Sequence, residues 1–411
     1  MEIIKTERAV RRMKKRAMAA AAFIICCLAG CGKPVSVAID GGQGADGFRT
    51  YFMYSVEINT QKGFYYPDQE GFMYFFDYDA EKDTIVCNKP NCKHQQWDEN
   101  TPLEERCNAY VGLHSTGFIS RDKLYIMENT YGNKGNHQIR IVESDLDRMN
   151  QREVTVFDSD SVFSFAVKEN MLYAIVDQIE QIDHKDGTIT SGSRKKAQLC
   201  SIDLSDGAIR VLMEKEDFSA VVTIMAVEDD RLYLDYSYFK KPFDGTNYKE
   251  ASQVVEYYEY STKTGELREV LKKFKEDQII KASFANGYLF AKTAPIDRSM
   301  NEGEDINCGL VKIDLATEEV QELVRMTERG MLFPNYAIYQ KDGEQGGFIY
   351  DFRKNKEVSA PKMNLEHFYP YCEAGEYVYG NLEDKKTREA HVGFYRLSDL
   401  MEGVVEYDTV D

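Results

Sequence analysis

Three cysteines and a histidine lie close together near position 100 of the chain. Four residues separate Cys87 from Cys92, one separates Cys92 from His94, and twelve separate His94 from Cys107. Three thiolates and an imidazole suit a structural Zn²⁺ site, because soft sulfur and borderline nitrogen match that ion and a filled tetrahedral shell leaves no position for substrate. A disulfide with one spare thiol would staple the same loop, residues 87–110, and three unlinked cysteines are the third alternative.

A catalytic thiol is the weakest interpretation of this cluster. His94 lies two residues from Cys92, but no neighbouring residue supplies a third group that would hold the imidazole as a base. The short motifs of serine hydrolases, zinc peptidases, P-loop proteins and dinucleotide-binding proteins are absent from the sequence. We therefore assign no catalytic residue.

The N-terminus has the regions of a secretory signal in the right order. A basic stretch precedes an apolar run of about 14 residues, which is short of the roughly 20 needed to cross a bilayer as a helix. The run ends in Leu28, Ala29 and Gly30, directly before Cys31, and this order resembles the bacterial lipobox. We expect cleavage after Gly30 and diacylation of Cys31, with an ordinary signal peptide or an uncleaved anchor as the alternative.

Lipidation of Cys31 predicts both a location and a division of the chain. Two acyl chains are what stable membrane attachment requires, so the mature protein would be extracytoplasmic and held to the cell membrane by a diacylglyceryl anchor. Residues 1–30 would be the lipoprotein signal peptide, residues 31–48 the lipidated cysteine with a flexible glycine-rich tether, and residues 49–411 one large domain that carries the loop 87–110.

The charge of the chain excludes one class of partner. The net charge is −18, and the first 30 residues carry +5, so the chain beyond them carries −23. A domain this acidic is repelled by nucleic acid. We therefore expect no nucleic-acid partner.

Two short signatures recur through the domain. The first is a polar turn followed by an apolar–aromatic pair that opens a strand, and the second is an alternating strand, an acidic turn and another strand, as in "LCSIDLSDGAIRVLM". The aromatic positions of the first signature are Tyr66, Tyr125, Tyr173, Tyr233, Phe290, Tyr339 and Tyr379. Four strands in each unit of 40 to 60 residues predict an all-β fold, a β-propeller of about seven four-stranded blades, with six or eight blades or a run of separate β-sandwiches as alternatives.

The apolar–aromatic pairs have a structural explanation in such a fold. Successive side chains of a strand point to opposite faces. We expect the leucines, for example Leu172, to face a core between blades, and the aromatic residues, for example Tyr173, to face the surface of the adjacent sheet.

A resemblance adds to these observations. The lipobox, the short tether, the segment "CNKPNCKH" closed by "CNAY" and the repeated hairpins resemble a group of lipoproteins from Gram-positive anaerobes, whose propeller-like repeats are akin to those of domains of unknown function. The resemblance implies a cell-surface location and a propeller fold. It implies no activity, substrate or catalytic residue.

Two functions fit these observations. The first is a non-enzymatic binding or scaffolding propeller, tethered to the membrane, for an extracellular glycan, peptide or envelope protein. The alternative is an extracellular carbohydrate-active enzyme, a glycosidase or lyase, on the same fold. The absence of catalytic motifs favours the binding function, and structural zinc is the one cofactor that the sequence suggests.

Overall fold

A computed structural model describes residues 49–409, apart from residues 53–57, 61, 69, 81, 99–100, 103, 113–114, 132–136, 184–188, 218–219, 242–252, 275–276, 297–307, 328–329, 342, 366–367, 375–376, 384–389 and 403–407. The chain divides into two compact units, Met1–Ala38 and Ile39–Asp411, and every described residue belongs to the second. The signal peptide, the lipobox, Cys31 and the tether lie outside the described residues and stay predictions. Within the described part, no helix is long and apolar enough to cross a membrane.

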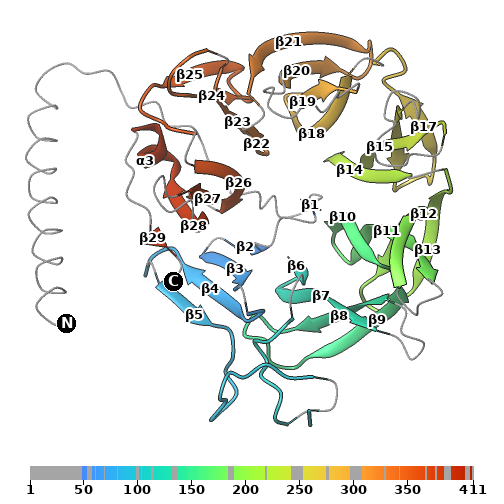
Figure 1. Ribbon diagram of the computed structural model, residues 1–411, viewed down its shortest axis with the longest axis vertical. Helices are drawn as coiled ribbons and strands as arrows, with labels where there is room; N and C mark the ends of the chain where they lie inside the picture. The colour runs from blue at the N-terminus through green and yellow to red at the C-terminus, as the bar shows by residue number, and fades with distance from the viewer. Residues whose placement is uncertain are drawn as a thin grey trace, which may run out of the picture. The chain divides into compact units, whose positions relative to one another are not determined.

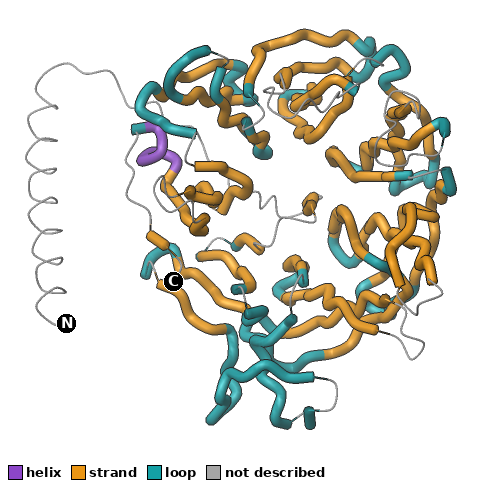
Figure 2. The backbone as a smooth tube through the Cα atoms, in the orientation of Figure 1, coloured by secondary structure: helices purple, strands orange, loops and turns teal. Residues whose placement is uncertain are grey.

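Antiparallel strands make up most of the described chain (Figure 2). They pair in sequence order into six sheets of four strands and one sheet of five. The sheets of the first half of the chain are β2–β5 (Ile58–Asn59, Gly63–Pro67, Met73–Asp77, Lys82–Ile85), β6–β9 (Thr116–Ser120, Lys123–Tyr131, His137–Ser144, Arg152–Asp158) and β10–β13 (Ser161–Lys168, Met171–Asp183, Ile189–Asp203, Ile209–Lys215), with β1 (Arg49–Phe52) beside β10. Those of the second half are β14–β17 (Val221–Glu228, Arg231–Phe239, Gln253–Ser261, Leu267–Val270), β18–β21 (Asp277–Ala285, Tyr288–Pro295, Cys308–Asp314, Glu319–Met326), β22–β25 (Met331–Leu332, Tyr336–Tyr339, Gly347–Asp351, Lys356–Ala360) and β26–β29 (Phe368–Ala374, Tyr377–Glu383, Ala390–Arg396, Asp408–Thr409).

The sheets stand side by side around a common centre, as the colours from blue to red show in Figure 1. Aromatic contacts join the last sheet to the first: the ring of Tyr377 in β27 lies 6.0 Å from that of Phe76 in β4 and 5.4 Å from that of Tyr78. The prediction of an all-β propeller with four-stranded blades is therefore confirmed.

The predicted strand count is wrong in one respect. Six sheets in the described part of the chain have four strands, but the β10–β13 sheet has a fifth, β1, which pairs antiparallel with β10 from Arg49 opposite Val167 to Phe52 opposite Ser164. The last hairpin also differs from expectation, because a short helix, α3 (Leu397–Met401), follows β28. The four residues of β1, Arg-Thr-Tyr-Phe, do not alternate between polar and apolar types, so no pattern indicates a strand there.

The apolar–aromatic pairs occupy the second strand of every sheet. Leu172 in β11 packs into the core shared with the β6–β9 sheet, and the next residue, Tyr173, packs against β14 and β15 on the other side. Leu232 and Tyr233 in β15 repeat the arrangement one sheet further on. The expected placement of these residues is confirmed, and these two pairs each join their sheet to both neighbours.

Side-chain hydrogen bonds also join neighbouring sheets at bulges in the inner strands. The pairing of β14 with β15 shifts beside Ile224, and the backbone N–H of Ile224 donates to Ser164 Oγ of the preceding sheet at 2.9 Å. The same occurs one sheet later, where the N–H of Ile279 donates to the hydroxyl of Tyr257 at 3.0 Å. A bulge leaves backbone groups without a partner in the ladder, and these side chains supply one.

One carboxyl group is buried between two sheets. Asp235 in β15 is 5% exposed and accepts hydrogen bonds from the side chains of Thr223 and of Gln278, which belongs to the next sheet. Burial raises the pKa of Asp235 to about 7, because the charged form loses its hydration there. The folded protein therefore binds this proton more tightly than the unfolded chain does.

The raised pKa of Asp235 predicts how stability depends on pH. Its stabilising contribution is complete below the ordinary pKa of about 4 and is lost as the pH rises towards 7. The variant Asp235→Asn, which cannot ionise, should melt a few degrees above the wild type at pH 8 and lose that advantage at pH 4. Thermal unfolding from pH 4 to 8 measures the difference. The control Asp206→Asn lies in an exposed turn and should show no such trend; a pH-independent difference for Asp235→Asn would contradict the assignment.

Candidate metal centre

The backbone brings Cys87 and Cys107 together because the chain leaves the edge of β4 after one cysteine and returns to the same edge after the other. The N–H of Val86 donates to the carbonyl of Met73, which completes the pairing of β5 with β4, and the chain departs at Cys87. The chain returns with Tyr110 bridged to Phe72, and the N–H of Met73 donates to the carbonyl of Ala109 at 2.8 Å. The returning segment thus continues, beside β4, the row of backbone hydrogen bonds that ends with β5. Cys87 and Cys107 therefore both lie near the N-terminal end of β4.

Two left-handed residues turn the loop back towards these cysteines. Asn91 has φ of 59° and His94 has φ of 49°, and the N–H of Cys92 donates to the carbonyl of Lys89 at 3.3 Å. Asparagine and histidine are among the residues that adopt this conformation most readily. As a result the Nδ1 atom of His94 lies 3.6 Å from Cys107 Sγ.

The four predicted ligands converge. One ligand atom each of Cys87, Cys92, His94 and Cys107 can be chosen so that all lie within 4.8 Å of one another, and the three thiols are not bonded to each other. Around a tetrahedral zinc ion, sulfur atoms at about 2.3 Å from the metal are about 3.8 Å apart, whereas a disulfide needs about 2.05 Å between sulfurs. The arrangement fits a closed Cys₃His shell after a small contraction.

The protonation of the thiols depends on their surroundings. Burial raises the pKa of Cys87, but the backbone N–H groups of Lys89 and Asn108 and the neighbouring thiols outweigh it, and the resulting pKa is below the ordinary value. Burial raises the pKa of Cys107, which is 2% exposed, to about 12. Ionising the Cys107 thiol therefore needs a cation beside it, and a bound metal ion deprotonates a coordinating thiol.

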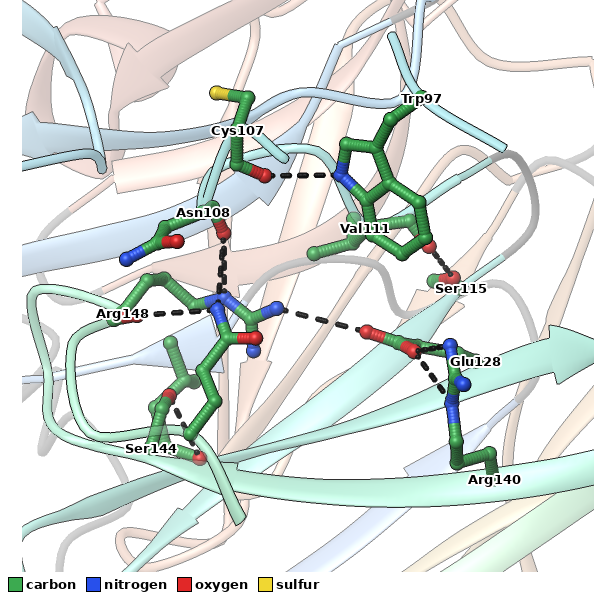
Figure 3. Close-up of polar contacts among 11 residues, drawn as sticks. Trp97, Cys107, Asn108, Val111, Ser115, Glu128, Arg140, Ser144 and Arg148 are labelled. Atoms are coloured by element: carbon green, nitrogen blue, oxygen red, sulfur yellow. Dashed lines mark hydrogen bonds and ion pairs between the residues drawn. The ribbon is translucent and has the colours of Figure 1, made fainter. Parts of the chain in front are cut away.

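Aromatic and polar contacts hold the returning half of the loop. The indole N–H of Trp97 donates to the carbonyl of Cys107 at 3.0 Å, as Figure 3 shows, and its ring meets Tyr110 edge-on with centroids 5.6 Å apart. The guanidinium of Arg106 lies 4.5 Å above the Trp97 ring. Because the indole N–H and the carbonyl satisfy each other, Cys107 is buried without leaving its own backbone oxygen unpaired.

Residues of the turn between β8 and β9 form hydrogen bonds to the loop of residues 87–110 and so join it to the β6–β9 sheet. Arg148 Nε donates to the carbonyl of Asn108 at 3.0 Å, and Asn88 Nδ2 donates to Asp147 Oδ2 at 2.9 Å (Figure 3 shows the first contact). No pattern in the sequence indicates these contacts. Arg148 and Asp147 lie in a stretch, "SDLDRMNQRE", whose composition is that of a solvated turn.

Comparisons with known proteins identify no family. No family model matches the chain, and no curated protein matches it. Solved structures with a similar fold include the β-propeller domain of the Trilobed protease from Pyrococcus furiosus (10% identity, TM-score 0.47, 88% of this chain and 95% of that one) and an oligogalacturonate lyase in complex with manganese (10% identity, TM-score 0.45, 84% and 89%). An apocarotenoid oxygenase from Synechocystis is 9% identical, with a TM-score of 0.39 and coverage of 84% and 69%. These similarities are too low to carry an argument about function.

Two glycines at the base of the loop offer a matched test of its geometry. Gly71 and Gly112 both have positive φ, 84° and 79°. A Cβ on Gly71 would lie 2.8 Å from the carbonyl carbon of Gly112, whereas a Cβ on Gly112 meets nothing within 4 Å. Alanine at either position costs about 1–3 kcal/mol of backbone strain, and only at Gly71 does it also push two backbone segments apart.

Gly71→Ala should therefore loosen the loop more than Gly112→Ala does. Trypsin cleavage after Lys93, followed by mass spectrometry under native conditions, should be fastest in Gly71→Ala, with a smaller increase over the wild type in Gly112→Ala. Equal cleavage rates in the two variants would show that the close approach of these segments does not hold the loop.

Proposed function

We propose that this chain is a membrane-anchored extracellular lipoprotein whose propeller is a non-enzymatic binding or scaffolding module for a glycan, peptide or envelope protein, with a loop stabilised by zinc. The observation that carries the proposal is the convergence of Cys87, Cys92, His94 and Cys107. A shell filled by four protein ligands is a structural site, because it leaves no open position for water or substrate. Such a centre stiffens the loop rather than performing chemistry.

The place of the loop supports a role in binding. Residues 86–112 extend from the outer edge of the ring between the β2–β5 and β6–β9 sheets (Figure 1). The loop has only a small apolar cluster of its own, in which Trp97 and Tyr110 pack beside Cys107 and Ala109, and a metal ion would add to this cluster in holding one conformation. A pre-ordered loop binds a partner with a smaller loss of conformational entropy. The carbohydrate-active enzyme remains the alternative that the sequence offers, and a screen against glycans and peptides addresses both.

The metal centre predicts the zinc content of the protein. The full chain purified under reducing conditions should contain about one zinc per molecule, and Cys107→Ser should lose most of it. Metal analysis and a free-thiol count measure this together. The control is Cys200→Ser, which removes a buried cysteine in the core between the β6–β9 and β10–β13 sheets and should keep the metal. A metal-free protein with two loop cysteines joined and one free thiol would establish the disulfide instead.

The lipid anchor makes a separate prediction. Cys31→Ser should move the protein from the membrane fraction to the soluble fraction and abolish incorporation of labelled fatty acid, because the acylated sulfur is removed. The variant Cys26→Ser/Cys27→Ser is the matched control, since these cysteines lie in the apolar run before the cleavage site. Fractionation and fatty-acid labelling decide the question. Membrane attachment that survives Cys31→Ser would point to an uncleaved anchor.

A further inference from the structure

Arg148 occupies a position that is unfavourable for an arginine. Its side chain is 1% exposed, its backbone has φ of 63°, and its Nη1 atom has no hydrogen-bond partner among the described residues. A buried charge, an unmet donor and a left-handed backbone each cost stability. A turn residue with these costs needs a compensating interaction.

The carboxylate beside Arg148 compensates only part of its charge. Glu128 Oε1 lies 3.5 Å from Arg148 Nη2, but Glu128 Oε2 also accepts two hydrogen bonds from Arg140, at 2.8 and 3.1 Å (Figure 3). Glu128 is itself only 6% exposed. Two guanidinium groups thus share one carboxylate, and the group of three carries a net charge of +1.

The loop of residues 87–110, which carries the proposed metal ligands, lies on the other side of the Arg148 guanidinium. Arg148 Nε donates at 3.0 Å to the carbonyl of Asn108, the residue that follows Cys107. A zinc ion with three thiolates and a neutral imidazole carries −1, which balances the +1 of the buried group. A disulfide with a protonated third thiol carries no charge and would leave the arginines uncompensated.

We infer that Arg148 is a positioning residue of the metal centre: it holds Cys107 through the Asn108 carbonyl and supplies the positive charge that balances a zinc ion bound by three thiolates. The inference rests on the proposed zinc centre. It adds a reason why the site would favour zinc bound by three thiolates over a disulfide with a protonated third thiol. Partners outside the ligand shell are known to govern metal affinity at other protein sites by about 10- to 100-fold.

The test is zinc affinity of the full chain, measured by competition with a chromophoric chelator. Arg148→Gln should bind zinc about 10- to 100-fold more weakly than the wild type. Arg148→Lys should recover much of the loss, because the charge returns without the planar hydrogen-bonding group. Arg152→Gln is the matched control: this nearby arginine pairs with Glu143 and the carbonyl of Leu204, away from the metal loop, and its loss should leave zinc affinity unchanged.

A second variant separates a charge effect from simple loss of structure. Glu128→Gln removes the competing carboxylate, so it should destabilise the fold yet bind zinc at least as tightly as the wild type. Weaker binding in Glu128→Gln, or equal binding in Arg148→Gln and Arg152→Gln, would overturn the role of Arg148 while leaving the zinc centre standing. A wild-type protein that binds no zinc would remove the centre itself.

Discussion

Each sheet of this protein has two apolar faces, and neither face is covered unless another sheet packs against it. The second strands show this most clearly, because adjacent residues such as Leu172 and Tyr173 enter the cores on opposite sides of one sheet. A sheet in the middle of a row can satisfy this requirement, but the first and last sheets cannot. The contact of Tyr377 with Phe76 removes the two free ends by joining the last sheet to the first.

The same requirement explains where the chain can leave the ring. An excursion after an outer strand leaves undisturbed the inner and middle strands, which have cores on both faces. The loop of residues 87–110 begins there, after β5, and its return beside β4 keeps the row of hydrogen bonds intact. The loop lies outside the cores between sheets, so ligands near its base and contacts to the next sheet supplement its own small apolar cluster around Trp97 and Ala109. The Cys/His cluster and the β8–β9 turn provide both.

The sequence predicts what depends on local pattern and misses what depends on distant contacts. The hairpins are visible because strand alternation and turn residues repeat, and the candidate ligands are visible because all four lie within residues 87–107. Arg148 comes 41 positions after Cys107, and its burial depends on a left-handed turn that composition does not reveal. Asp235 looks like one polar residue in an aromatic strand, and only the neighbouring sheet shows that it is buried. The fifth strand, β1, shows no alternation of polar and apolar residues.

The central claim is that the loop is organised by a metal ion bound to three cysteines and one histidine. X-ray absorption at the zinc edge of the purified full chain tests it most directly. We expect about three sulfur neighbours at about 2.3 Å and one nitrogen at about 2.0 Å from the zinc. A first shell made mainly of oxygen, or a disulfide between any two of Cys87, Cys92 and Cys107 found by peptide mapping, would contradict it.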